Sequence, residues 1–247
     1  MRQFGLIGRS LGHSFSQKFF TEKFHNECID ARYALFPMEK CDRAILHALI
    51  ESHSNLEGLN VTIPYKETVI ELCDSLTPEA LAIGAVNTLI IRPDGIIGAN
   101  TDCQGFRQSV ENLLKNTGEA YVLGTGGAAK AVAYALTKMG CCVTFVSRNP
   151  AGRQEVIGYE ALADGRLGKA AIIVNATPLC TWPDVAEAPQ IPYLQLAPHT
   201  LCYDLVYNPA VTEFMRRCAE QGCPVKNGLD MLHRQAILSW QYWNEGR

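Results

Sequence analysis

The 247-residue sequence lacks a long hydrophobic run and has no large excess of charge of either sign. Apolar stretches such as Ala170–Val174 are far shorter than the roughly 18 residues expected of a membrane-spanning helix. The 22 Lys and Arg against 25 Asp and Glu give a formal net charge of −3, the wrong sign for a protein that binds nucleic acid through a basic surface. Since 47% of the residues are apolar, the chain can form a core. We therefore expect a globular protein with neither nucleic acid nor membrane as a partner.

Metal-ligand motifs are also lacking. The ten cysteines are scattered, none forms a C-x-x-C motif, and zinc-ligand spacing is absent. A disulfide framework is typical of small secreted chains, whereas Met1–Gly8 is typical of a first strand and not of a signal peptide. The sequence predicts reduced, mostly buried cysteines, no metal site and a cytoplasmic location.

What the chain does contain is a regular alternation of apolar runs and segments of helical periodicity. Strands are expected at Phe4–Ile7, Arg32–Phe36, Leu56–Ile63, Ala120–Leu123, Cys142–Val146, Ala171–Val174 and Leu201–Leu205, with a hairpin of Val86–Ile91 and Ile96–Ala99. Helices are expected at Gln17–Cys28, Cys41–Ile50, Thr68–Cys73, Cys103–Leu114, Ala129–Met139, Val211–Ala219 and Leu229–Trp243. This alternation predicts two α/β domains with a boundary near residues 100–102.

A glycine-rich turn joins one expected strand to the next helix. Gly124-Thr125-Gly126-Gly127-Ala128-Ala129 fits the pattern G-x-G-x-x-A. Gly124 permits the tight turn, Gly126 lets backbone N–H groups approach a pyrophosphate, and Ala129 lets the helix pack close to the strand. The helix N-terminus also offers free donors and positive potential to a phosphate. The surrounding strand–turn–helix–strand order predicts a Rossmann-type dinucleotide-binding domain.

The end of the following strand indicates which dinucleotide is bound. NAD sites usually carry an acidic residue about 20 residues after the glycines, but Ser147-Arg148-Asn149 stands there. Arg148 suits a 2′-phosphate, and Arg153 is a second candidate cation, because a guanidinium stays charged and donates two parallel hydrogen bonds. The sequence therefore favours NADP over NAD.

Polar side chains also mark the strand ends of the first domain. They occur in the segments Asn60–Lys66, Gly84–Thr88 and Asn100–Asp102. Their amide, hydroxyl and carboxylate groups suit a polyhydroxylated substrate. Asp102 has an alternative role as the N-cap of the helix that follows it.

Taken in order, these segments resemble the shikimate dehydrogenase family over nearly the whole chain. The resemblance rests on Gly12–Ser16, Asn60–Lys66, Gly84–Thr88, Asn100–Gly105, Gly124–Ala128, Ser147–Arg148, Asn175–Pro178, Tyr203–Pro209 and Met231–Ala236. It implies two α/β domains with a cleft between them. A substrate-binding catalytic domain would comprise residues 1–101 and 229–247, and a Rossmann-type NADP-binding domain would comprise residues 102–228.

The resemblance also implies an activity, the NADP-dependent reversible reduction of 3-dehydroshikimate to shikimate in aromatic amino-acid and chorismate biosynthesis. Lys66 would donate and accept the proton, with Asp102 as its partner. The implied substrate residues are Ser14, Ser16, Asn60, Thr62, Asn87, Tyr207 and Gln235, of which the two serines would hold the substrate carboxylate. The implied cofactor residues are Gly124, Gly126, Gly127, Ala128, Ser147, Arg148, Arg153, Thr177, Gly228 and Met231.

The chain departs from the family pattern at four places. Gln17 stands where a proline is usual, and Cys180 stands where a glycine is common. Asp230 replaces a common glycine, and we expect this extra carboxylate to weaken cofactor binding or alter closure. The chain is also shorter than the usual family member, and we place the loss after Arg153.

Two other functions stay open at this point. A quinate/shikimate dehydrogenase differs by one substrate hydroxyl near Ser14 and Ser16, which the sequence does not settle. A non-catalytic NADP-binding module would be expected to lose Lys66 or Asp102, and both are present. The oligomeric state is open as well, with a homodimer as one expectation.

Overall fold

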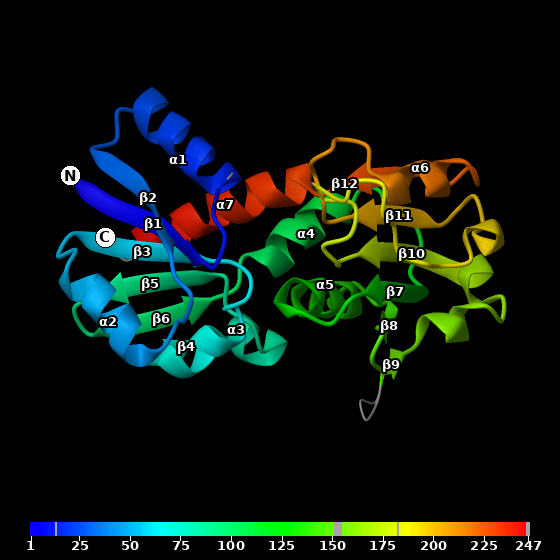
Figure 1. Cartoon of the computed structure of the whole chain (residues 1–247), viewed down its shortest axis with the longest axis horizontal. Helices are drawn as coiled ribbons and strands as arrows, with labels where there is room; N and C mark the ends of the chain where they lie inside the picture. Colours follow the sequence, from blue (N-terminus) through cyan, green and yellow to red (C-terminus); the bar gives the residue numbers. More distant parts are fainter. Residues whose placement is uncertain (13, 151–154, 182, 246–247) are drawn as a thin grey trace. The chain divides into compact units, whose positions relative to one another are not determined.

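The computed structural model describes residues 1–12, 14–150, 155–181 and 183–245. The chain divides into two compact units, one made of Met1–Thr101 with Gln235–Arg247 and the other of Asp102–Arg234. Each unit is built on one six-stranded sheet (Figure 1). Among the described residues, no helix is both long enough and apolar enough to span a membrane.

The sheet of the first unit mixes parallel and antiparallel strands in the order β2-β1-β3-β5-β6-β4. β1 pairs in parallel with β2 and β3, whereas β5 runs antiparallel to β3 and to β6, and β4 runs parallel to β6. The strands are β1 (Arg2–Gly8), β2 (Ala31–Pro37), β3 (Leu56–Val61), β4 (Ser75–Leu76), β5 (Thr88–Arg92) and β6 (Gly95–Ala99). The β5–β6 hairpin predicted from the sequence is confirmed.

Two apolar clusters give this sheet a core on each face. One contains Phe4, Phe20 and Trp243, and it includes residues of α1 and of the C-terminal part of α7. The other contains Leu46, Leu59 and residues of α2, η1 and α3. The helices are α1 (Phe15–Asn26), α2 (Arg43–Glu51), the 3₁₀ helix η1 (Thr68–Leu72), α3 (Pro78–Ile83) and α7 (Leu229–Asn244).

The last turn of α7 is held to the sheet by Trp243. Its ring stacks on Phe4 with centroids 4.7 Å apart, and its Nε1 donates to the Leu89 carbonyl over 3.0 Å. Gly58 on β3 makes this approach possible, because a Cβ at that position would collide with the indole. The final residues of α7 therefore complete the core of the unit that contains β1.

The sheet of the second unit is wholly parallel, in the order β12-β11-β10-β7-β8-β9. β7 lies at the centre of the sheet. From β7 the chain adds β8 and β9 on one side and then β10, β11 and β12 on the other. The topological switch point therefore lies between β7 and β10. The strands are β7 (Glu119–Leu123), β8 (Cys142–Val146), β9 (Val156–Ile157), β10 (Ala170–Asn175), β11 (Leu201–Asp204) and β12 (Val225–Asn227). The predicted Rossmann-type fold is confirmed.

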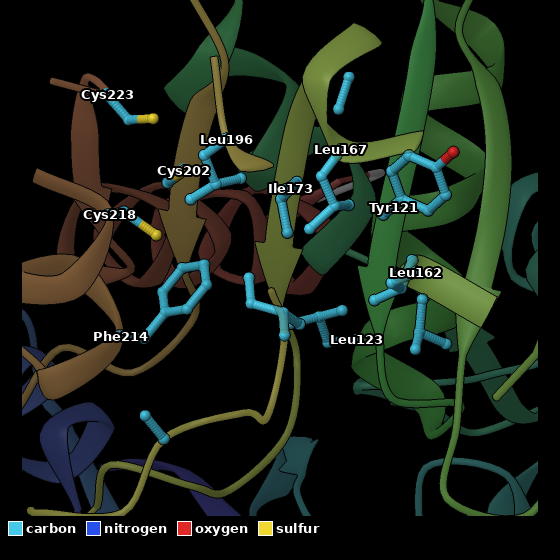
Figure 2. Close-up of a cluster of buried hydrophobic side chains, with 14 of the residues drawn as sticks. Tyr121, Leu123, Leu162, Leu167, Ile173, Leu196, Cys202, Phe214, Cys218 and Cys223 are labelled. Atoms are coloured by element: carbon cyan, nitrogen blue, oxygen red, sulfur yellow. The ribbon is translucent and has the colours of Figure 1, made fainter. Parts of the chain in front are cut away.

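Helices and 3₁₀ turns cover this second sheet. The helices α4 (Asp102–Val110) and α5 (Gly127–Lys138) contact each other. Figure 2 shows part of the core of this unit, a cluster that includes Leu123, Ile173 and Cys202 of the strands and Phe214 of α6 (Glu213–Ala219). The 3₁₀ helices are η2 (Tyr159–Leu162), η3 (Arg166–Lys169) and η4 (Tyr193–Gln195).

All ten cysteines lie among the described residues as free thiols. Seven are buried, Cys73 is half-buried, and only Cys28 and Cys142 are exposed. The prediction of reduced cysteines that mostly pack in the core is confirmed.

Some predicted element boundaries are wrong. Thr68–Leu72 is a 3₁₀ helix and not an α-helix, and α4 ends at Val110 instead of Leu114, leaving Leu113 43% exposed. β4, β9, β12 and α3 were not predicted, because elements of two to six residues are too short to show a hydrophobic period. α3 did carry a start signal, since Thr77 caps it through the Ala80 N–H and Pro78 begins it.

Candidate active site

The glycine turn of the second unit exposes backbone groups at Gly124 and Gly126, which have no side chains. Gly124 follows β7 with a φ of 110°, a conformation that favours glycine. Gly126 is the N-cap of α5 and supplies no side-chain cap to the first-turn N–H groups. A Cβ at Gly126 would meet nothing within 4 Å. Backbone donors at a helix N-terminus facing open space are what a pyrophosphate needs, so the chain fits a dinucleotide here.

The other predicted cofactor residues of this unit follow the carboxyl ends of its parallel strands. A Cβ on Gly124 would lie 3.1 Å from the Ala176 carbonyl and 3.4 Å from Thr177 Cγ2, which places Thr177 after β10 next to the glycine turn. Gly228, after β12, approaches the Leu205 carbonyl so closely that a Cβ would collide with it. In open α/β sheets this edge is where ligands bind.

Arg148 lies exposed after β8, as a residue that reads a 2′-phosphate should. It is placed beside Tyr159 of η2, where burial raises the pKa of the phenol and the Arg148 charge opposes that shift. The Ser147 hydroxyl accepts from the Asn149 N–H over 3.2 Å, which shapes this turn. Arg153 lies outside the described residues.

Asp230 does not stand as an uncompensated carboxylate near the cofactor residues. Its two oxygens pair with Lys226 Nζ at 2.8 Å and with Arg234 Nε at 2.7 Å. Burial alone would raise the pKa of Asp230, but these two cations hold it below its ordinary value. Met231, the next residue, is buried. The negative charge expected to oppose the cofactor is therefore neutralised within α7 and β12.

Asp204 and Asn175 form a second buried polar group at the same sheet edge. Asp204 accepts from Asn175 Nδ2 over 2.9 Å, and Asn175 Oδ1 accepts from the Thr177 hydroxyl over 2.6 Å. Both residues are fully buried. Tyr207, three residues after Asp204, is half-buried, and burial raises the pKa of its phenol.

The first unit gathers three of its predicted substrate residues, Asn60, Asn87 and Gln235, into one buried polar cluster. Asn87 Nδ2 donates to Thr101 Oγ1 over 2.9 Å and to Gln235 Oε1 over 3.4 Å, and Asn87 Oδ1 accepts from the Thr101 N–H over 2.7 Å. Asn60 Nδ2 donates to Ser239 Oγ over 2.9 Å. Residues at the ends of β3, β5 and β6 thus share one hydrogen-bond network with α7.

The serine segment joins this network through a tyrosine. The Tyr33 hydroxyl, which hydrogen-bonds Ser16, donates to Asn60 Oδ1 over 2.8 Å, and burial raises the pKa of this phenol. Ser14 is half-buried and is the N-cap of α1, where its Oγ accepts from the Gln17 N–H over 3.2 Å. The glutamine in place of proline therefore supplies the N–H that the cap uses.

Lys66 and Thr62 lie beside this cluster, and both are half-buried. The Lys66 carbonyl accepts from the Val86 N–H over 2.7 Å, next to Asn87 in the chain. Asp102 is 5% exposed and begins α4, directly after Thr101. The structure thus links Asn60, Asn87 and Gln235 in the first unit, and it places Thr177 next to Gly124 in the second.

Two members of the cluster, Tyr33 and Ser239, were missed by the sequence analysis, whereas Thr88 lies in the predicted polar segment Gly84–Thr88. Tyr33 and Ser239 each stand in an apolar segment, and only tertiary contacts reveal their roles; Ser239 Oγ, for example, lies 2.9 Å from Thr88 Oγ1. Among the described residues, no group of three or more His, Cys, Asp or Glu could hold a metal ion.

Comparison with known proteins shows to which family this chain is similar. A family model described as the shikimate dehydrogenase substrate binding domain matches residues 6–89. Shikimate dehydrogenase (NADP(+)) of Clostridium beijerinckii is 37% identical, over 99% of this chain and 93% of the relative. The chain belongs to the shikimate dehydrogenase family.

Solved structures of the family extend over the same length. Shikimate dehydrogenase 1 from Peptoclostridium difficile is 34% identical with a TM-score of 0.86, covering all of this chain and 93% of that one. Shikimate 5-dehydrogenase from Thermus thermophilus, in complex with NADP(H) and shikimate, is 29% identical with a TM-score of 0.85, covering 99% of this chain and 94% of that one. The similarity therefore includes both units and is not confined to the cofactor half.

Proposed function

We propose that this protein is an NADP-dependent shikimate dehydrogenase, an oxidoreductase that interconverts 3-dehydroshikimate and shikimate in aromatic amino-acid and chorismate biosynthesis. The observation that carries the proposal is the family similarity along both units, together with retention of the whole polar set from Ser14 to Gln235. Residues 1–101 and 229–247 are proposed to bind substrate and residues 102–228 to bind NADP.

The cofactor contributes one thing to this reaction: bound NADPH supplies the hydride that the C3 ketone receives. The chain orients the reactants and handles the proton. The first-turn N–H groups of α5 would hold the pyrophosphate, and Arg148 would hold the 2′-phosphate. Ser14 and Ser16 would bind the substrate carboxylate, while Asn87 and Gln235 would bind ring hydroxyls.

Lys66 is proposed as the proton donor in reduction and the acceptor in oxidation, with Asp102 as its partner. As the ketone oxygen gains charge, a donor within hydrogen-bond reach stabilises it, an effect typically worth ~10²–10⁴-fold in rate. Replacing Lys66 by alanine should lower kcat for NADP-linked shikimate oxidation by about that factor. A kcat close to that of the wild type would contradict the assignment.

A spectrophotometric assay at about 340 nm, where reduced nicotinamide absorbs, tests the whole proposal. Shikimate with NADP should give the highest kcat/KM, and quinate should be a poorer substrate. Equal turnover of quinate would favour a quinate/shikimate dehydrogenase, and NADP binding without turnover would favour a non-catalytic module. An equal rate with NAD would contradict the role of Arg148. The predicted homodimer and cytoplasmic location stay predictions, which light scattering and cell fractionation would test.

A further inference from the structure

Asp204 is a buried carboxylate for which the proposed reaction has no chemical use. It ends β11 and is fully buried, yet it accepts three hydrogen bonds. Asn175 Nδ2 lies 2.9 Å away, the Val206 N–H lies 3.0 Å away, and Thr212 Oγ1 lies 2.6 Å away. These donors come from the end of β10, the loop after β11 and the start of α6, so one side chain ties three segments together.

The negative charge of Asp204 sets the direction of the hydrogen bonds toward Thr177. A carboxylate can only accept, so Asn175 turns its NH₂ group to Asp204 and its carbonyl oxygen to Thr177. The Thr177 N–H and hydroxyl then donate to that oxygen over 3.1 and 2.6 Å. The conformation of the Thr177 turn, which lies next to Gly124, therefore depends on the charge of Asp204, to which the turn is linked through Asn175.

The same carboxylate also fixes the loop that carries Tyr207. Val206 and Thr212 lie on either side of Tyr207, and both donate to Asp204. The Val206 carbonyl in turn accepts from the Gly228 N–H over 3.3 Å. Three of the residues proposed to contact cofactor or substrate, Thr177, Tyr207 and Gly228, are thus held through one group.

Keeping this group charged is costly for the fold. Burial raises the pKa of Asp204 to about 6, against the lowering effect of its three hydrogen bonds. The Cys180 thiol is a titratable group beside it, and burial is the chief cause that raises the pKa of this thiol. Glu213 of α6 faces the same thiol, but its carboxylate pairs with Arg216 and Arg217. A protonated Asp204 would carry a donor, and the fixed order of donors and acceptors would be lost.

We propose that Asp204 is a positioning residue whose negative charge holds the Thr177 turn and the Tyr207 loop in the conformation that binds NADP(H). The inference rests on the proposed function, because it assumes that this sheet edge binds the cofactor. The variant Asp204→Asn keeps the shape of the side chain and removes the charge at every pH. It therefore mimics the protonated wild type.

The test is the dissociation constant of NADPH, followed by its fluorescence from pH 5 to pH 8.5. The 2′-phosphate of NADPH titrates near pH 6, but it affects the wild type and Asp204→Asn equally. The ratio of their dissociation constants, variant over wild type, therefore reports only the difference between the two proteins. We expect Asp204→Asn to bind NADPH about tenfold more weakly than the wild type at pH 8, because the variant lacks the charge-assisted hydrogen bonds of the carboxylate. The ratio should approach one at pH 5, with a midpoint near pH 6.

The matched control is Asp184→Asn, an exposed aspartate of the same unit, which should follow the wild type at every pH. A ratio for Asp204→Asn that is constant with pH, whether large or equal to one, would overturn the inference. If the wild type binds no NADPH at any pH, the proposed function itself fails, and that result is distinct.

A second pair of variants covers the case in which Asp204→Asn does not fold. Thr212→Val removes one donor to Asp204, which should raise its pKa and move the acid loss of NADPH affinity to higher pH. Thr212→Ser keeps the hydroxyl and should leave the profile unchanged. Coincident profiles for these two variants would contradict the inference.

Discussion

Asn60 and Ser239 lie 179 positions apart in the chain, and Asn60 Nδ2 donates to Ser239 Oγ over 2.9 Å. The serine is fully buried on α7, and its hydroxyl donates a hydrogen bond to the Gln235 carbonyl over 2.9 Å. One hydroxyl thus couples the end of β3 to the helix that carries Gln235. This contact joins segments far apart in the sequence, among them those that carry the proposed substrate residues Asn60 and Gln235.

Removal of that hydroxyl in Ser239→Ala should lower the free energy of unfolding by about 1–3 kcal/mol, because Asn60 loses a buried partner. The KM for shikimate should rise as Asn60 and Gln235 lose their alignment. Denaturant unfolding and steady-state kinetics measure the two effects. An unchanged KM would mean that the serine serves stability alone.

Gly58→Ala should destabilise the first unit by roughly 1–3 kcal/mol, the usual cost of overpacking. The added methyl group would collide with the Trp243 indole, which is itself fully buried. Gly168→Ala is the matched control, since its Cβ would meet only the Gln195 carbonyl at 3.5 Å. Thermal unfolding of the two variants gives the comparison, and equal midpoints would contradict the expectation.

Gly126→Ala separates cofactor binding from stability. Its backbone has an ordinary φ of −77° and space around the Cβ position, so the melting temperature should fall only slightly, because alanine is a poorer N-cap than glycine. The methyl group would, however, occupy the open cradle at the N-terminus of α5, and NADPH affinity should drop by at least about tenfold, or ~1.4 kcal/mol. Unchanged affinity would show that the pyrophosphate binds elsewhere.

Cys180 occupies a position that favours glycine. Its φ is 73° and its side chain is fully buried in the core of the second unit. Cys180→Gly and Cys180→Ala both lose the sulfur, but only the glycine relieves the left-handed backbone. Cys180→Gly should therefore be the more stable of the two by about 1 kcal/mol, as measured by urea unfolding. The opposite order would argue against backbone strain at this residue.

Stability should also depend on pH through Asp204. Burial raises its pKa from 3.8 to about 6 in the folded chain. The stability that Asp204 contributes is therefore fully present below pH 3.8, and it is lost as the pH rises through about 6 and the buried group becomes charged. Relative to Asp204→Asn, the wild type should lose up to about 3 kcal/mol of unfolding free energy between about pH 4 and pH 7. A difference that grows with pH instead would mean that the carboxylate is stabilised by its donors.

The sequence predicted best where local signals and the fold agree. The run from β7 through Gly124 and α5 to β8 combines buried strands with a glycine turn, and its bounds were nearly correct. β12 was missed because three residues carry no period, although the resemblance had named Gly228, the residue after it, as a cofactor residue. Tyr33 and Ser239 could not be assigned from their neighbours in sequence, because their partners are set by how β2, β3 and α7 pack.

The single helix α7 belongs to both units, since its residues from Gln235 onward complete the unit that contains Met1. During synthesis, the unit whose strands leave the ribosome first is therefore the last to finish folding. It must wait, with the pocket for Trp243 open against Gly58 and Phe4, until α7 has been translated. A stop codon placed just before Gln235 would leave the parallel-sheet unit nearly whole and deprive the other of part of its core.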